Sequence, residues 1–520
     1  MRPLFDEMKR FTLSSRPMRI LGIMLASLGA GAVVAVAQTN APAGRKLSLE
    51  DCIEIALRHN LDIEINRLNP ELARFTLSAT YGAYDPNVSI SGEHDYSVSP
   101  GSVDPQGRPF GGSSRDVDII SGSISGLAPW GMTYGAGVNL GDAYGINQGG
   151  FGTPGTPFES TGGSLSAFTL RQPLLKNSWV DSTRLQIIIN RKNLQISELA
   201  LRLQVMNSVT AVEAAYFGVI SARENIVVQQ KAVELAERQL TENRKRVEVG
   251  AMAPLDEKQA ESLAAQSRAD LLAAIGSEQT QQRVLKDLLS DNYSEWKDTA
   301  VEPTEKLVAV PERFDLQESW KKGLTQRPDL LQQKVGLEKQ VQVVRYQKNQ
   351  LFPELDLFGT GGWNAGSREF SGALNQFANR DAPFWSYGAQ ITFPLTQRAA
   401  RNNYKFAKAT KEQIELQLNQ LEQRVLIQIE DAIANANTSF QRVGATREAR
   451  IYAEQALEAE QKKLESGKST SFQVLQLTKD LTTARSAEIG ALTQYNIDLA
   501  RVAFNEGSTF ERRHITLEWK

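Results

Sequence analysis

The side chains that most often carry chemistry in proteins are few in this sequence and lie far apart. Cys52 is the single cysteine, so the chain can form neither an intrachain disulfide nor a cluster of thiolate metal ligands. The three histidines, His59, His94 and His514, are separated by long stretches, and this spacing does not support a histidine-built metal or catalytic site. The sequence also lacks a nucleophile motif, a metal-ligand motif and a phosphate-binding loop. We therefore expect no enzyme activity, no cofactor and no metal site.

The composition argues against a nucleic-acid partner and indicates two kinds of segment. The 520 residues include 58 Lys+Arg and 60 Asp+Glu, and the net charge of -2 offers no basic face for nucleic acid. Of the 38 glycines, 19 lie between residues 81 and 165. Proline is absent from residues 174–253 and from residues 395–520. Because glycine and proline interrupt helices, this distribution predicts a β section and long uninterrupted helices.

The N-terminus has the layout of a secretory signal peptide. Basic residues precede an apolar stretch over 20–36, and Ala35-Val36-Ala37 forms a small-x-small cleavage site before Gln38. A retained membrane anchor is the alternative, which the glycine- and alanine-rich stretch and the cleavage pattern disfavour. Residues 1–37 are therefore predicted to direct export. After them the sequence holds no run of about 18 apolar residues, so a mature chain that crosses a membrane must do so as a closed β-barrel.

The chain repeats itself, which favours a duplicated unit over the three or four domains that its length would suggest. Residues 47–57 align with 314–324, and Val247-Glu248-Val249-Gly250 aligns with Leu464-Glu465-Ser466-Gly467. The predicted organisation is a first repeat over 38–289, a linker over 290–313, a second repeat over 314–505 and a C-terminal tail over 506–520.

Each repeat is predicted to contain the same series of elements. It begins with a helix of about 35 residues, over 47–80 and 314–350, which Ser48 and Asp51 cap and Pro70 kinks in the first repeat. Alternating strands follow, predicted at 87–98, 117–127, 132–140, 164–172, 353–363 and 384–393. A polar loop with Asn375, Asn379 and Asp381 separates the last two strands. Heptad-like apolar spacing then predicts long coiled-coil helices over 177–249 and 397–465, each returning after a glycine turn as a shorter helix, 255–289 and 471–505.

The predicted strands suit a membrane barrel that several chains share. A single chain offers four to six strands, whereas a membrane barrel needs about eight or more, so copies of the chain must pool their strands. The strands also carry aromatic residues that would form girdles at the membrane interfaces, namely Tyr96, Tyr134, Trp363, Trp385 and Tyr387.

The ordered set of motifs resembles the TolC-like outer-membrane efflux family, from Leu47 to about Gly507. The residues that carry the resemblance are Leu47-Ser-Leu-Glu-Asp51, Arg327-Pro-Asp-Leu330, Gln172-Pro-Leu-Leu175, Phe393-Pro-Leu395 and the two glycine turns. The resemblance implies an α+β membrane protein, in which a homotrimer shares a transmembrane β-barrel continuous with a coiled-coil tunnel in the periplasm of a Gram-negative cell. Such proteins are passive exit ducts of tripartite efflux or type I secretion systems, and a periplasmic adaptor links them to an inner-membrane pump.

The resemblance also implies roles for particular residues. Adaptors dock at the helical tips, which here contain Arg246, Val249, Gly250, Leu464, Ser466 and Gly467. Some members narrow the tunnel with acidic rings, and the corresponding positions here are Gln473 and Gln476, which lack the charge that attracts cations. The linker and tail are expected to form a belt around the middle of the tunnel.

Two questions stay open at the level of sequence. The additional strands over 117–140 could form a hairpin outside the barrel or enlarge its wall. A trimeric coiled-coil surface protein with a β anchor, similar to an adhesin, is the competing interpretation, although it predicts no duplication. The cargo, whether drug, metal ion or polypeptide, is chosen by the pump and adaptor and is not encoded in these motifs.

Overall fold

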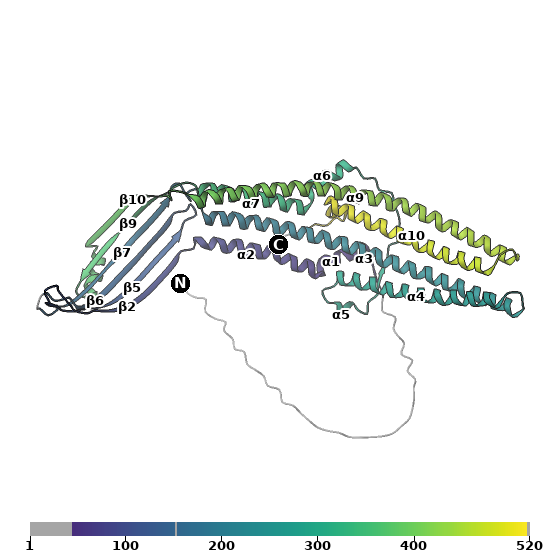
Figure 1. The fold of residues 1–520 in the computed structure, drawn as a ribbon, viewed down its shortest axis with the longest axis horizontal. Helices are drawn as coiled ribbons and strands as arrows, with labels where there is room; N and C mark the ends of the chain where they lie inside the picture. The colour runs from purple at the N-terminus through teal and green to yellow at the C-terminus, as the bar shows by residue number, and fades with distance from the viewer. Residues whose placement is uncertain (1–43, 151–152, 517–520) are drawn as a thin grey trace, which may run out of the picture. The chain divides into compact units, whose positions relative to one another are not determined.

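A computed structural model of the protein describes residues 44–150 and 153–516 (Figure 1). The predicted signal peptide, residues 1–37, lies outside the described residues. The first half contains β1 Arg45–Leu47, α1 Leu49–His59, α2 Leu61–Tyr81, a 3-10 turn at Gly82–Tyr84, β2 Asn87–Ser99, β3 Ser102–Val103, β4 Pro109–Phe110, β5 Ser113–Leu127, β6 Thr133–Ile146, β7 Pro157–Pro173, α3 Ser182–Glu248 and α4 Pro254–Leu289.

The second half repeats this order with fewer strands. It contains α5 Tyr293–Trp296, β8 Val301–Pro303, α6 Leu316–Gln326, α7 Pro328–Asn349, β9 Glu354–Ser367, α8 Phe370–Asn379, β10 Ala382–Thr392, α9 Arg398–Glu465, α10 Ser471–Glu506 and α11 Thr509–Arg512. Both halves therefore run from two short helices through strands to a long helix and its returning partner, as the internal duplication predicts.

The first helix of each half is broken in two, which corrects the prediction of single helices over 47–80 and 314–350. The breaks fall at Asn60 and Arg327, whose backbones are extended. The Asn60 side chain accepts from the Ile63 N–H at 3.1 Å and so caps α2, while Arg327 precedes Pro328, whose ring disfavours helix at the residue before it. Pro70 lies within the unbroken α2. The capping box of Ser48 and Asp51 is present at the start of α1, as predicted.

The predicted polar loop between the last two strands is mostly helical. Helix α8 contains Asn375 and Asn379 and ends at Arg380, which adopts a left-handed conformation with φ of 61°. Ala373 is the buried residue of this short helix, which packs against β9. The sequence signal was missed because ten residues are too few to establish a helical period against a polar background.

Six strands form one antiparallel sheet in the order β10-β9-β7-β6-β5-β2. The additional strands β5 and β6 lie inside this sheet, between β2 and β7, and are hydrogen-bonded on both sides. Neighbouring strands β6 and β7 are paired with one irregularity, between Gly135 and Gly137. Figure 1 shows β2 following α2 at one edge of the sheet and β10 at the other edge.

The helices form a layer. Those that connect directly to the sheet lie side by side in the same order as the strands to which they are joined. Helix α2 packs against α3, α3 against α7 and α7 against α9, while α4 and α10 return along α3 and α9. The largest core cluster joins α1, α3, α4 and α10 around Tyr216, whose hydroxyl donates to the Leu47 carbonyl at 3.1 Å. Cys52 is buried in this cluster, and burial raises the pKa of its thiol to about 12, so it is a neutral packed side chain.

Helix α3 could by length and composition cross a membrane, and it is the single helix of the described residues that meets this test. However, 67% of its most apolar 18-residue window is buried inside the protein. Its apolar residues are the stripe that contacts α2, α4 and α10. The helix is therefore explained as a core helix of the bundle.

The segment 290–313 and the tail after Glu506 pack against the middle of the long helices. Strand β8 pairs in parallel with β1, and Gln282 of α4 exchanges two hydrogen bonds with the Val301 backbone, at 2.8 and 3.0 Å. From the tail, Arg513 donates to the buried Glu213 of α3 at 2.6 Å. The two segments thus tie α3, α4 and the C-terminus together at one level of the bundle.

Candidate functional site

The register of the six-stranded sheet separates its apolar and polar side chains onto two faces. One row of paired residues, on what we call the apolar face, contains Ile90, Gly122, Val138, Leu165 and Trp363. The adjacent row, on the opposite or polar face, contains Ser91, Ser121, Asn139 and Ser164. Because side chains alternate along a strand, this contrast continues toward the helical end of the sheet, whereas nearer the strand loops the same face carries His94, Asp118 and Asp142.

The apolar face is exposed in the single chain. The side chains of Ile90 and Tyr387 are 81% and 80% exposed. Further exposed apolar residues on the same face are Val88, Tyr96, Val98, Ile120, Ile124, Phe168, Leu357, Trp385 and Ile391. Exposure of so many large apolar groups to water is unfavourable, whereas a lipid environment accommodates them. A sheet that is apolar on one side and polar on the other is the pattern of a transmembrane barrel wall.

All five aromatic residues predicted for the membrane interface lie on this apolar face. Tyr134 and Tyr387 belong to one row across the sheet, through Leu170 and Gly359. The Trp385 and Tyr387 rings stack, with centroids 5.8 Å apart, and the Arg380 guanidinium lies 5.3 Å from the centroid of the Trp363 ring. Tyr96 shares the alternation of Ile90 on β2. The register therefore places all five aromatic residues on one face, with Tyr96 toward the end of the sheet remote from Tyr134, while their role at a lipid interface remains a prediction.

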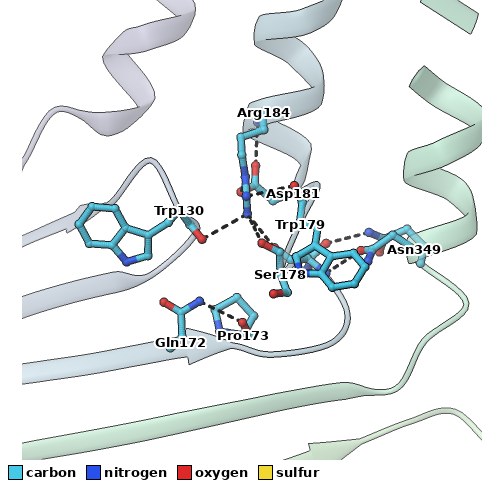
Figure 2. A network of polar contacts seen from close by, with 10 residues as sticks. Trp130, Gln172, Pro173, Ser178, Trp179, Asp181, Arg184 and Asn349 are labelled. Atoms are coloured by element: carbon cyan, nitrogen blue, oxygen red, sulfur yellow. Dashed lines mark hydrogen bonds and ion pairs between the residues drawn. The ribbon is translucent and has the colours of Figure 1, made fainter. Parts of the chain in front are cut away.

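Arg184 organises the junction between the sheet and the long helix α3 (Figure 2). Its Nε donates to Asp181 Oδ2 at 2.7 Å, and Asp181 in turn caps α3. Its terminal nitrogens donate to backbone carbonyls of Trp130, Asn177, Ser178 and Trp179, at 2.8 to 3.3 Å. The Trp130 carbonyl belongs to the turn between β5 and β6. One guanidinium therefore fixes the connection after β7 to the neighbouring strand turn.

Asn349 holds the other side of the same junction. Its Oδ1 accepts from the Asn177 N–H at 2.7 Å, and its Nδ2 donates to the Leu175 carbonyl at 3.2 Å. Asn177 has a positive φ of 64°, which asparagine tolerates better than most residues. The end of α7 and the start of α3 are thus linked across the two repeats. Sequence reasoning missed Arg184 and Asn349 because their partners are mainly backbone groups, which leave no residue pattern.

The two helical tips have the same backbone motif. In the first, the Ala251 N–H donates to the Arg246 carbonyl at 2.7 Å and the Gly250 N–H to the Val247 carbonyl at 3.0 Å. In the second, Lys468 and Gly467 donate to Lys463 and Leu464 in the same way, at 2.8 and 3.1 Å. These are Schellman motifs, in which the glycine takes a left-handed conformation, with φ of 74° at Gly250 and 73° at Gly467.

The predicted docking residues differ in their exposure. Val249 is 78% exposed, and Arg246, Ser466 and both glycines also lie at the tip surface. Leu464 is 8% exposed, because it packs with Val474, Leu457 and Met252 in a cluster that joins the two tips. Leu464 therefore supports the tip from inside, and the surface that a partner could contact is formed by the other predicted residues.

A buried polar network also joins the two tips. Asn243 of α3 donates from Nδ2 to Ser471 Oγ of α10, and its Oδ1 accepts from Gln239 at 3.1 Å. All three side chains are buried. The network fixes the register between the helix hairpins, because a shifted pairing would leave these groups without partners.

Gln473 and Gln476, the predicted tunnel constriction, lie exposed on the first turns of α10. Gln476 donates from Nε2 to Asp480 Oδ1, 3.1 Å away and one turn further along. Gln476 and Asp270 both line a groove of about 580 Å³ between α4 and α10. Although both positions are uncharged, the carboxylate of Asp480 therefore lies one helical turn from Gln476. Comparison of single positions with the family did not identify it.

An antiparallel sheet with one apolar face, joined to paired helical hairpins, defines an envelope channel fold. The family model "Outer membrane efflux protein" matches residues 169–290 and 321–507. These residues are more than half of the chain, and the protein belongs to this family. It is accordingly an outer-membrane protein whose helical part lies in the periplasm, and the predicted family and location are confirmed.

Individual relatives agree with this assignment. The outer membrane protein TolC of Escherichia coli (strain K12) is 24% identical over 317 residues, which are 58% of this chain and 62%, less than two thirds, of TolC. The Campylobacter jejuni CmeC outer membrane channel is 16% identical with a TM-score of 0.63, covering 89% of this chain and 86% of CmeC. The Vibrio cholerae outer membrane protein VceC is 17% identical with a TM-score of 0.64, covering 89% and 96%. At these identities the two structures confirm the α+β fold.

Because Arg184 binds several acceptors, a conservative substitution at this position should lower the stability of the protein by an unusually large amount. We expect Arg184→Lys to destabilise the protein by about 2 kcal/mol, because a single lysine ammonium cannot reach all the acceptors that the guanidinium binds in different directions within its plane. Thermal unfolding of the detergent-purified protein measures the loss. Arg191→Lys on the same helix is the control, since Arg191 is exposed and donates to one hydroxyl, that of Tyr81. Equal stability of the two variants would contradict the role of Arg184.

Replacing a tip glycine and replacing a mid-helix glycine by alanine should change the stability of the protein in opposite directions. Gly250→Ala and Gly467→Ala should each cost about 1 kcal/mol through backbone strain alone, because an added Cβ meets no atom within 4 Å. Gly276→Ala in the middle of α4, where the surroundings are equally open, should instead stabilise by about 0.5–1 kcal/mol. Hydrogen exchange of the tip amides and thermal unfolding distinguish the two cases. A stabilising Gly250→Ala would rule out the left-handed tip.

Proposed function

We propose that three copies of this chain form a passive exit duct in the outer membrane, which a periplasmic adaptor connects to an inner-membrane pump. The observation that carries the proposal is the six-stranded sheet, which exposes an apolar face and has two open edges. Such a duct performs no chemistry of its own and serves either a tripartite efflux system or type I secretion. Membership of the outer membrane efflux family supports this function.

The helical layer offers a matching edge for self-association. Helix α2 presents an exposed stripe at spacings of 4, 3, 4 and 3, formed by Leu61, Ile65, Leu68, Leu72 and Phe75. These side chains are 50–60% exposed, although the spacing is that of a coiled-coil seam. At the opposite edge, α9 exposes Phe406 and Leu416. A second copy that covers α2 with its α9 would bury both sets of residues.

The adaptor would dock at the helical tips, which lie at the ends of the helices remote from the sheet (Figure 1). Val249 and Ser466 supply exposed side chains there and Arg246 a half-buried one, while Gly250 and Gly467 keep the two turns narrow. The shared cluster around Leu464 makes the two tips of one chain a single surface. The pump and adaptor would then select the cargo.

The duct is tested with the full-length protein, expressed with residues 1–37 included and purified from membranes. We expect a trimer that migrates more slowly on gels before heating than the separated chains do after it, and stepwise single-channel currents in planar bilayers. A coiled-coil surface protein similar to an adhesin would also assemble but would not conduct. A stable assembly without conductance would therefore reject the duct in favour of that structural role.

The two glutamines give a prediction about cation block. Gln473→Asp and Gln476→Asp should each make the channel more sensitive to multivalent cations, because three copies would place three carboxylates around one ring. The wild type should be blocked less strongly, with Asp480 as the nearby carboxylate. Block of the bilayer current by a trivalent cation, added at the tip side, measures the difference. Gln106→Asp, in the β3–β4 turn, is the control at the other end, and equal block in all four proteins would refute a constriction at Gln473 and Gln476.

A further inference from the structure

We infer that all six strands of each copy enter the barrel, so that the trimer closes a wall of eighteen strands. Its bore would be wider than that of a trimer in which each copy contributes four strands. The inference rests on the proposed trimer and specifies its pore. The partner at each open edge is a second copy of this chain, whose β10 pairs with β2 of its neighbour. The simplest form of the repeat, with two strands per half, would give twelve strands.

The strand directions permit this closure. Each neighbouring pair in the sheet is antiparallel, from β10 through β9, β7, β6 and β5 to β2. Because the number of strands is even, β2 and β10 run in opposite directions. Rotation of one copy onto the next therefore brings two antiparallel strands together, and the completed wall is antiparallel throughout. An odd number would have placed two parallel strands at each joint.

The open edges cannot remain unpaired in a membrane. Strand β2 has 13 residues, all exposed, and β10 has 11, so each is long enough to span the hydrocarbon core. Their outer edges present backbone N–H and C=O groups that have no water to bind in lipid, and each unpaired group costs several kcal/mol. A matching strand from another copy satisfies them. The apolar face continues over the joint, from Trp385 and Tyr387 on β10 to Val88 and Ile90 on β2.

The additional strands β5 and β6 have the properties of barrel wall and not of an appended hairpin. They pair without interruption from Ser114–Ile146 to Leu127–Thr133. On the apolar face they carry Ile120, Ile124, Val138 and Leu140, and on the polar face Ser121, Ser123 and Asn139. A hairpin outside the membrane would have no need for this apolar patch, which ends toward the loops at Asp116, Asp118 and Asp142. The alternation thus matches that of the strands on both sides of it.

A wider barrel moves the narrow part of the duct to the helices. Barrel diameter grows roughly linearly with strand number, so eighteen strands enclose a bore about 1.5 times as wide as twelve. The polar face is lined largely by small residues, such as Ser121, Ser123, Ser164 and Gly137, which leave this width open. The strands are therefore expected to impose less size selection than the helical tips, and the large side chains of the polar face, such as Arg171 and Phe358, lie toward its helical end.

Strand counting by cryo-electron microscopy of the full-length protein in lipid nanodiscs tests the inference. We expect eighteen strands, with β2 of one copy against β10 of the next. A variant in which a short glycine–serine loop replaces residues 100–156 joins β2 directly to β7 and should form twelve strands, with about two thirds of the diameter. The control variant lacks residues 102–110, the small β3–β4 hairpin, and should retain eighteen.

The outcomes separate this inference from the proposed function. A conducting trimer with a twelve-stranded wall, in which β5 and β6 lie outside it, would overturn the inference and leave the duct intact. Loss of both trimer and conductance in the wild type would reject the duct itself. The wild-type strand count decides the question even when the shortened variant fails to fold, and exclusion of neutral polymers from the barrel side gives a second measure of the bore.

Discussion

The hydrogen bonding of two sheet edges is the constraint on which the rest of this structure depends. Strands β2 and β10 end the six-stranded sheet, and in lipid their free backbone groups have no solvent to satisfy them. In the proposed trimer, neighbouring copies meet this requirement at both edges, and the exposed apolar face contacts lipid. This requirement also fixes the parity of the strands, because antiparallel closure by rotation needs an even number in each copy. Helices α2 and α9, which adjoin the edge strands, consequently become the edges of the helical layer.

At the junction between sheet and helices, the backbone groups also need hydrogen-bond partners. Four connections join helices and strands at one level, two in each direction, and each interrupts regular backbone pairing. Arg184 binds carbonyls of the connection after β7 and of the β5–β6 turn, while Asn349 binds Asn177 and Leu175. Because these donors come from α3 and α7, the two repeats are joined where the strands end. The connections between the sheet and the helices are therefore held by side chains of the helices as well as by strand pairing.

Patterns that repeat along the chain could be predicted from the sequence, and contacts between distant segments could not. Strand alternation identified the positions of all six long strands, and the proline-free heptad spacing identified α3 and α9. The break at Asn60 was missed because its cause is tertiary: the Asn60 side chain also donates to the Leu288 carbonyl of α4. Leu464 has the sequence context of an exposed turn, yet contact with the other hairpin buries it. The membership of β5 and β6 in the sheet likewise required pairing partners from both neighbours, β2 and β7.

The asymmetry between the two repeats follows from the same edge constraint. Each repeat sends one helix into the strands and receives one back on the same side, so only an even number of strands can be inserted. The first half contains four long strands and the second contains two, and the difference is one hairpin, β5–β6. Such an insertion lengthens the wall while α2, α3, α7 and α9 keep their order. Barrel width and tunnel width can therefore vary independently in this architecture. The contacts at the junction fix how the helices pack, whereas the number of strands between α2 and α3 changes only the circumference of the barrel.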